Sequence, residues 1–109
     1  MGKPVAGDVV VLPFPQTNLQ QGKRRPALVV ADLQGDDLIL CQITSQAHRD
    51  TYSIQIDKGD FVSGQLATLS YVRPSRLFTV EQSVVIYTAA RLSNAKLKEA
   101  LATLRRMFS

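Results

Sequence analysis

The chain has 109 residues, a formal net charge of +4 and a single cysteine, Cys41, and 45% of its residues are hydrophobic. This length fits one domain over residues 1–109, and one cysteine excludes an internal disulfide and a multi-cysteine metal site. No apolar run approaches the roughly 20 residues of a membrane-spanning helix, and no secretory signal is visible. We therefore expect a cytoplasmic protein without a membrane partner, whose positive charge suits a polyanion.

Short apolar runs separated by Gly, Asp, Pro and Ser predict a meandering antiparallel sheet. The expected strands are residues 8–14, 26–32, 38–44, 52–56, 65–72 and 83–89. Pro26 has a fixed φ and no N–H, so we expect it to begin the second strand. Gly35 is expected to supply a positive φ in a hairpin turn over residues 32–37. Alternating residues of 65–72 would line opposite faces of the sheet.

The end of the chain changes to a helical period. Apolar residues recur there at steps of three and four: Leu97, Ala100, Leu101, Leu104 and Phe108. This spacing predicts an amphipathic helix, with Ser93 placed to cap its N-terminus. Arg105 and Arg106 fall in the last turn, where cations stabilise a helix; ligand binding is the alternative role. The predicted fold is therefore mainly β, a small antiparallel barrel or strongly bent sheet closed by a C-terminal helix.

The usual signatures of catalysis are sparse. The chain has no glycine-rich phosphate loop and no zinc-binding pair of histidines, because His48 is its only histidine. Most aspartates lie in turn-like stretches, where solvation or capping explains them. Cys41 lies in an apolar run and is expected to be a small core residue rather than a nucleophile. The sequence therefore predicts chemistry without a metal or cofactor, or binding alone.

Four segments carry a family resemblance through their order and spacing. They are GDVVVLPF (7–14), RRPALVV (24–30), QITSQ (42–46) and SYVRPSRLFTV (70–80). Together they resemble the PemK/MazF-type toxins of bacterial toxin–antitoxin pairs. The resemblance implies an SH3-like barrel with a C-terminal helix, assembled as a homodimer. It also implies a sequence-specific endoribonuclease that cuts single-stranded mRNA without a metal and is neutralised by a cognate antitoxin.

The resemblance assigns catalytic roles to Arg25, which precedes the proline of the second strand, and to Thr44, in the pair that closes the third. Metal-free RNA cleavage uses the ribose 2′-OH as nucleophile and leaves a 2′,3′-cyclic phosphate and a 5′-OH. A guanidinium can stabilise the negative charge that grows on the phosphorane, and a threonine hydroxyl can hold a phosphate oxygen or the 2′-OH. Without the resemblance, Arg25 reads as a surface ion-pair residue and Thr44 as an ordinary strand residue.

Further residues near these two form the expected RNA-binding set. They are Thr17, Asn18, Gln20, Lys23, Arg24, Ser45, Gln46, His48, Arg49, Ser70 and Arg73. Cations would attract the phosphates, while polar side chains would meet base edges. Solvated loop positions are the alternative for most of them. Some family members carry an acidic catalytic residue near the position of Ser70, which cannot replace it as a base, so the proton acceptor stays open.

Two other functions stay open at the level of sequence. CcdB-type gyrase-binding toxins share the implied fold, although the C-terminal RRMFS of this chain lacks the tryptophan-containing ending expected of that group. The third possibility is a family member that binds RNA or antitoxin without cleaving.

Overall fold

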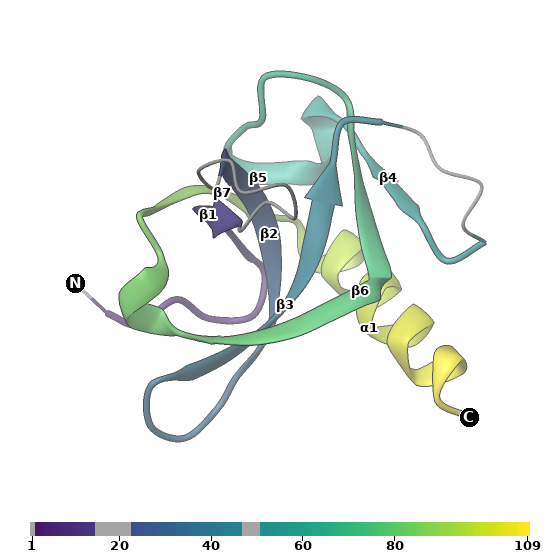
Figure 1. The fold of residues 1–109 in the computed structure, drawn as a ribbon. Helices are drawn as coiled ribbons and strands as arrows, with labels where there is room; N and C mark the ends of the chain where they lie inside the picture. Colours follow the sequence, from purple (N-terminus) through teal and green to yellow (C-terminus); the bar gives the residue numbers. More distant parts are fainter. Residues whose placement is uncertain (1, 15–22, 47–50) are drawn as a thin grey trace.

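The computed structural model describes residues 2–14, 23–46 and 51–109, which form seven strands in one antiparallel sheet. The strands are β1 (Asp8–Phe14), β2 (Lys23–Asp32), β3 (Asp37–Thr44), β4 (Ile54–Ile56), β5 (Phe61–Gly64), β6 (Ser70–Glu81) and β7 (Tyr87–Leu92). Their order across the sheet is β4-β6-β3-β2-β1-β7-β5. The sheet is strongly bent, and helix α1 (Asn94–Met107) contacts β6 and β2 (Figure 1). The predicted fold class is therefore confirmed.

The central strands are buried on both faces, which explains why their sequences are continuously apolar. Val9, Leu28 and Cys41 belong to the core cluster that includes Ala100 of α1. Their neighbours along the same strands belong to a second cluster: Val10, Leu12, Ala27, Val29, Leu38 and Leu40. Because successive strand residues point to opposite faces, each strand contributes alternately to the two clusters. The second cluster is covered by Phe14 and Phe78, whose rings meet edge to face.

β2 begins earlier than the sequence predicts. It starts at Lys23, so Pro26 is its fourth residue and not its first. Pro26 pairs with Val11 of β1, whereas the pairing of β2 with β3 begins only at Ala27 and Gln42. A residue without an N–H is tolerated at this position because β2 has a paired neighbour on one side only.

The predicted strand over 65–72 is wrong for residues 65–69, which form a loop. β6 begins at Ser70 and continues through Pro74 to Glu81. Its pairing with β3 shifts between Arg73 and Leu77, which leaves Pro74 and the next residues outside the regular ladder. Such a bulge needs no N–H from the proline and bends the strand, as the sharp turn of β6 in Figure 1 shows.

Other strands also differ from the prediction, and β4 begins at Ile54 rather than at residue 52. The expected strand over 83–89 begins only at Tyr87, because a 3₁₀ turn (Gln82–Val84) comes first, and it runs on to Leu92. The short strand β5 follows another 3₁₀ turn (Lys58–Asp60) and is absent from the sequence-based assignment. The differences at β5 and β7 lie beside short 3₁₀ turns, which are too short to show a hydrophobic period in the sequence.

Helix α1 confirms the predicted helix and cap. The Ser93 hydroxyl accepts a hydrogen bond from Lys96 N at 3.2 Å. Ala100 is buried, but Phe108 is 74% exposed, so its expected place on the apolar stripe is wrong; the helix ends one residue earlier. Arg106 lies over the Tyr52 ring, with Cζ 5.8 Å from the ring centroid. In the described part of the chain, no helix is long and apolar enough to cross a membrane.

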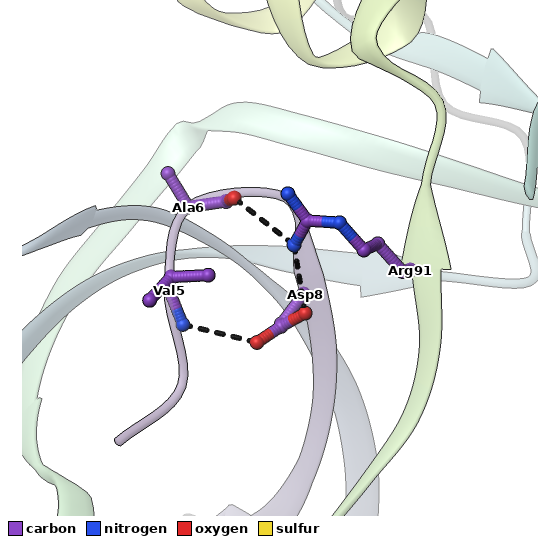
Figure 2. A network of polar contacts seen from close by, with 4 residues as sticks. All are labelled: Val5, Ala6, Asp8 and Arg91. Atoms are coloured by element: carbon purple, nitrogen blue, oxygen red, sulfur yellow. Dashed lines mark hydrogen bonds and ion pairs between the residues drawn. The ribbon is translucent and has the colours of Figure 1, made fainter. Parts of the chain in front are cut away.

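A polar corner ties the start of β1 to the end of β7 (Figure 2). Asp8 Oδ1 lies 3.0 Å from Arg91 Nη1, and Asp8 Oδ2 accepts a hydrogen bond from Val5 N at 3.0 Å. Arg91 Nη1 also donates to Ala6 O at 3.4 Å. Between them, Gly7 adopts φ +100°, donates to Val29 O and accepts from Leu92 N. The corner therefore joins β1, β2 and β7 just before α1 begins.

Gly64→Ala is expected to destabilise the protein far more than Gly35→Ala. Both glycines have positive φ, +64° and +86°, which costs an alanine about 1–2 kcal/mol. A Cβ at Gly64 would also fall on the Ala89 carbonyl oxygen and lie 2.8 Å from Ala90 Cα, whereas nothing lies within 4 Å at Gly35. We expect a loss of at least about 3 kcal/mol at Gly64. Urea unfolding followed by circular dichroism measures both losses, and equal losses would contradict this packing.

Cys41 is expected to be unreactive in the folded protein. It is 0% exposed, and burial raises the pKa of its thiol from 9.0 to about 12. This shift alone lowers the thiolate fraction at pH 8 by about a thousandfold. Because the pKa is higher in the folded state, the thiol ionises first in the unfolded chain. Its ionisation therefore leaves the free energy of unfolding unchanged below about pH 9 and lowers it as the pH rises from 9 towards 12. Rapid labelling of native protein by Ellman's reagent at pH 8 would overturn the expectation; urea-unfolded protein is the positive control.

Candidate functional site

A pocket of about 430 Å³ opens where β2 and β3 separate. The two strands pair as far as Ala27 and Gln42. On the other side of this point, β2 follows β1, with Arg25 opposite Leu12, whereas β3 follows β6, with Thr44 opposite Tyr71. The strand ends therefore diverge, and the pocket lies between them.

Residues of several strands and of the β5–β6 connection line this pocket. They are Val11 of β1; Arg24, Arg25 and Pro26 of β2; Ile43 and Thr44 of β3 and Ser45 after it; Gln65, Leu66, Ala67 and Thr68 of the β5–β6 connection; Ser70 of β6; and Tyr87 and Ala89 of β7. Among these described residues, two are arginines and none is acidic. Such a lining gives a positive potential and suits an anionic ligand. Elsewhere too, the described residues bring no three His, Cys, Asp or Glu together to hold a metal ion.

Five of the predicted site residues meet in this pocket. They are Arg24, Arg25, Thr44, Ser45 and Ser70. Arg25 lies two residues before Ala27 and Thr44 two residues after Gln42, so both flank the point at which β2 and β3 separate.

The other predicted residues fall into three groups. Lys23 and Gln46 are exposed next to the pocket, at the start of β2 and after β3. Arg73 is half-buried on β6 opposite Gln42, outside the lining. Outside the described residues lie Thr17, Asn18, Gln20, His48 and Arg49. The RNA-binding roles of all of them stay predictions.

The Thr44 hydroxyl is oriented by the chain that follows it. Its Oγ1 accepts a hydrogen bond from Gln46 N at 3.2 Å, which closes a tight turn at the end of β3. A hydroxyl has one hydrogen to donate and two lone pairs, so Thr44 can still donate to an anionic oxygen in the pocket. The turn therefore fixes the orientation of the Thr44 side chain at the edge of the pocket.

The loop of residues 65–69 forms a wall of the pocket, and Ser70 holds it. Ser70 is only 4% exposed, and its Oγ donates a hydrogen bond to Thr68 O at 2.9 Å. A smaller cavity of about 40 Å³ lies against the same loop, which Leu66, Ala67 and Thr68 also line. In the structure, Ser70 thus positions the loop.

Several pocket residues are not identified by the sequence. Tyr87, Gln65 and Thr68 lie in stretches that the sequence assigns to strands, without a chemical role. An alternating pattern predicts which residues share a face, but it does not predict that the β5–β6 loop meets the start of β7. Of these three residues, only Tyr87 has an aromatic side chain that could draw attention in the sequence. Its exposure and its place in the pocket are known only from the structure.

Comparison with known proteins identifies the family. The family model described as "PemK-like, MazF-like toxin of type II toxin-antitoxin system" matches residues 6–108. The chain belongs to this family. The PemK/MazF match begins just before β1 and ends with the last residues of α1. A search of curated proteins gave no match.

Solved structures with the PemK/MazF fold superimpose over nearly the whole chain. A MazE–MazF crystal structure from Deinococcus radiodurans (Form-II) has 26% sequence identity and a TM-score of 0.77, covering 99% of this chain and 97% of that chain. Form-III of the same pair has 22% identity and a TM-score of 0.77, covering 98% and 97%. An endoribonuclease in complex with its cognate antitoxin, from a mycobacterial species, has 13% identity and a TM-score of 0.74, covering 96% and 94%.

Ser70→Ala is expected to cost about 1 kcal/mol of unfolding free energy, because it removes a nearly buried hydrogen bond to the Thr68 carbonyl. Ser83→Ala is the matched control: Ser83 is exposed, and its loss should stay within about 0.5 kcal/mol. Urea unfolding compares the two variants. If Ser70→Ala cost no more than the control, the hydroxyl would not hold the loop.

Proposed function

We propose that this PemK/MazF-family protein is an endoribonuclease that cuts single-stranded RNA in the pocket between β2 and β3. One observation carries the proposal: Arg24 and Arg25 share a pocket with the Thr44 hydroxyl, and no acidic residue is among its described lining. This combination suits a phosphodiester, because guanidinium groups present paired donors to phosphate oxygens. Family membership supports it further, as does the structural likeness to proteins named endoribonucleases.

In the proposed reaction the ribose 2′-OH attacks the adjacent phosphorus, and the bond from phosphorus to the 5′ oxygen breaks. The products are a 2′,3′-cyclic phosphate and a 5′-OH. Arg25 stabilises the charge that develops on the phosphorane oxygens, and Thr44 holds a phosphate oxygen so that attack is in line. The described lining offers no carboxylate or imidazole. In this scheme water accepts the 2′-OH proton, and water returns a proton to the 5′ oxygen as it leaves.

The proposal includes a cognate antitoxin as partner and a homodimer as the working unit, in the cytoplasm. The solved MazE–MazF pairs support the antitoxin. A pocket with two arginines would attract an acidic antitoxin segment, which would then exclude RNA by competing for the same cations. Sequence-specific cutting would come from the polar groups around the pocket, since unstacked bases expose their edges to side chains.

The test is cleavage of a long end-labelled RNA in EDTA by folded, antitoxin-free protein. We expect cuts at a recurrent short motif, with 2′,3′-cyclic phosphate ends. Arg25→Ala should slow cutting by about a hundredfold or more, and Thr44→Val by about tenfold. Arg25→Lys should recover little, because an ammonium lacks the planar fork. Lys98→Ala removes an exposed cation on α1 and is the control, which should cut at the wild-type rate.

Three results would contradict the proposal. Intact RNA with folded wild-type protein would favour a gyrase-binding toxin or a family member that only binds. Loss of cutting in EDTA would contradict the metal-independent mechanism. Equal cutting by Arg25→Ala and Lys98→Ala would place the chemistry elsewhere.

A further inference from the structure

We propose that Tyr87 is a base-stacking residue, which holds one RNA base beside the phosphate that Arg24 and Arg25 contact. This inference rests on the proposed function and adds the position and chemistry of one base site. Tyr87 belongs to none of the sequence motifs, and its role follows from its place in the sheet.

A row of cross-strand neighbours connects Tyr87 to the basic end of the pocket. Tyr87 of β7 is opposite Val11 of β1, and Val11 is opposite Pro26 of β2. Directly opposed residues of antiparallel strands share one face, so the three lie side by side. Because strands lie about 4.8 Å apart, the row spans roughly 10 Å. All three residues line the pocket.

The exposure of these residues changes along the row. Val11 is 8% exposed and Pro26 is half-buried, whereas Tyr87 is 53% exposed. Val11 and Pro26 therefore form an apolar floor, and the tyrosine ring stands at its edge with much of its surface open to solvent. A base that stacks on the ring would cover this surface, because every nucleobase has an apolar π-face.

The charge at the other end of the row fits the rest of a nucleotide. Arg24 lies two residues before Pro26 and shares its strand face, and Arg25 lies between them. Arginines at one end and an aromatic ring at the other match a phosphate and its base. Aromatic stacking is the usual way in which proteins hold bases of single-stranded RNA out of their own stack. The row therefore fits an extended single strand better than a duplex, whose bases are stacked and paired.

The loop of residues 65–69 supplies the groups that could distinguish one base from another. Gln65 and Thr68 line the same pocket and offer an amide and a hydroxyl. The Thr68 carbonyl is already bonded to Ser70, which fixes the loop. Stacking on Tyr87 tolerates any base, so the choice of base falls to these hydrogen-bonding groups. Tyr87 would set where the base lies and the loop would read its edge.

Binding of a short single-stranded RNA tests the proposal. The RNA carries the cut position mapped above, with a 2′-deoxy sugar at the attacking ribose, so that affinity is measured without cleavage. Fluorescence anisotropy should show a Kd about fivefold to a hundredfold higher for Tyr87→Ala. Tyr87→Phe keeps the ring and should stay within about twofold of wild type. Ile86→Ala is the matched control, because Ile86 is 42% exposed on the preceding position and does not line the pocket.

A series of abasic RNAs separates stacking from other effects. At one position, removing the base should weaken wild-type binding by about the same factor, and Tyr87→Ala should then cause no further loss. Melting temperatures within a few degrees of wild type would show that the variants are folded.

Other outcomes would overturn the role of Tyr87. If Tyr87→Ala bound as tightly as wild type while Arg25→Ala bound weakly, the stacking role would fall and the proposed function would stand. Equal losses on every abasic RNA, or an equal loss for Ile86→Ala, would show that this surface supports the pocket or a protein partner instead. If wild-type protein neither bound nor cut RNA, both proposals would fall together.

Discussion

The pairing of β2 with β3, and the point at which it stops, is the constraint on which the site depends. Between Ala27 and Asp32 the two strands are neighbours in a sheet that is buried on both faces. A slip of one residue would exchange the side chains of the two core clusters, so burial fixes the register. Arg25 and Thr44 lie just outside this locked segment. Their relative positions therefore come from the core and not from any contact between them.

The opposite side of the pocket depends on a different set of interactions. Tyr87 begins β7, and the far end of that strand is held by the ion pair between Asp8 and Arg91 and by the backbone bonds of Gly7. These bonds join β7 to β1 and β2, close to where α1 packs. Strand β1 pairs with both β7, which carries Tyr87, and β2, which carries the arginines, so it fixes these two sides of the pocket relative to each other. In contrast, the loop of residues 65–69 is held at the pocket by the Ser70 hydroxyl.

The sequence predicts the parts of this structure that depend on local patterns. The hairpin turn at Gly35, the capped helix and the apolar strands all have strong local signals, and family resemblance adds Arg25 and Thr44. The sequence does not predict the bulge at Pro74 or the loop at 65–69, because short alternating runs suit a strand or a loop equally. Nor does it predict the exposure of Phe108, because a helical period does not show that the helix ends at Met107. The role of Tyr87 is also hidden. It becomes visible only when β7, β1 and β2 are placed side by side, which is a property of the tertiary structure.

The separation between a rigid core and a pocket at its edge has a consequence for how such proteins diversify. Because burial of the core, and not the pocket, sets the strand register, substitutions at Gln65, Thr68 or Tyr87 should change the free energy of unfolding only slightly. Selection can therefore change which ligand the pocket accepts in single steps, each through a folded intermediate. The same fold in solved structures that share little sequence with this chain fits such a history. A toxin that evolves in this way can escape one antitoxin or acquire another target while its scaffold stays the same.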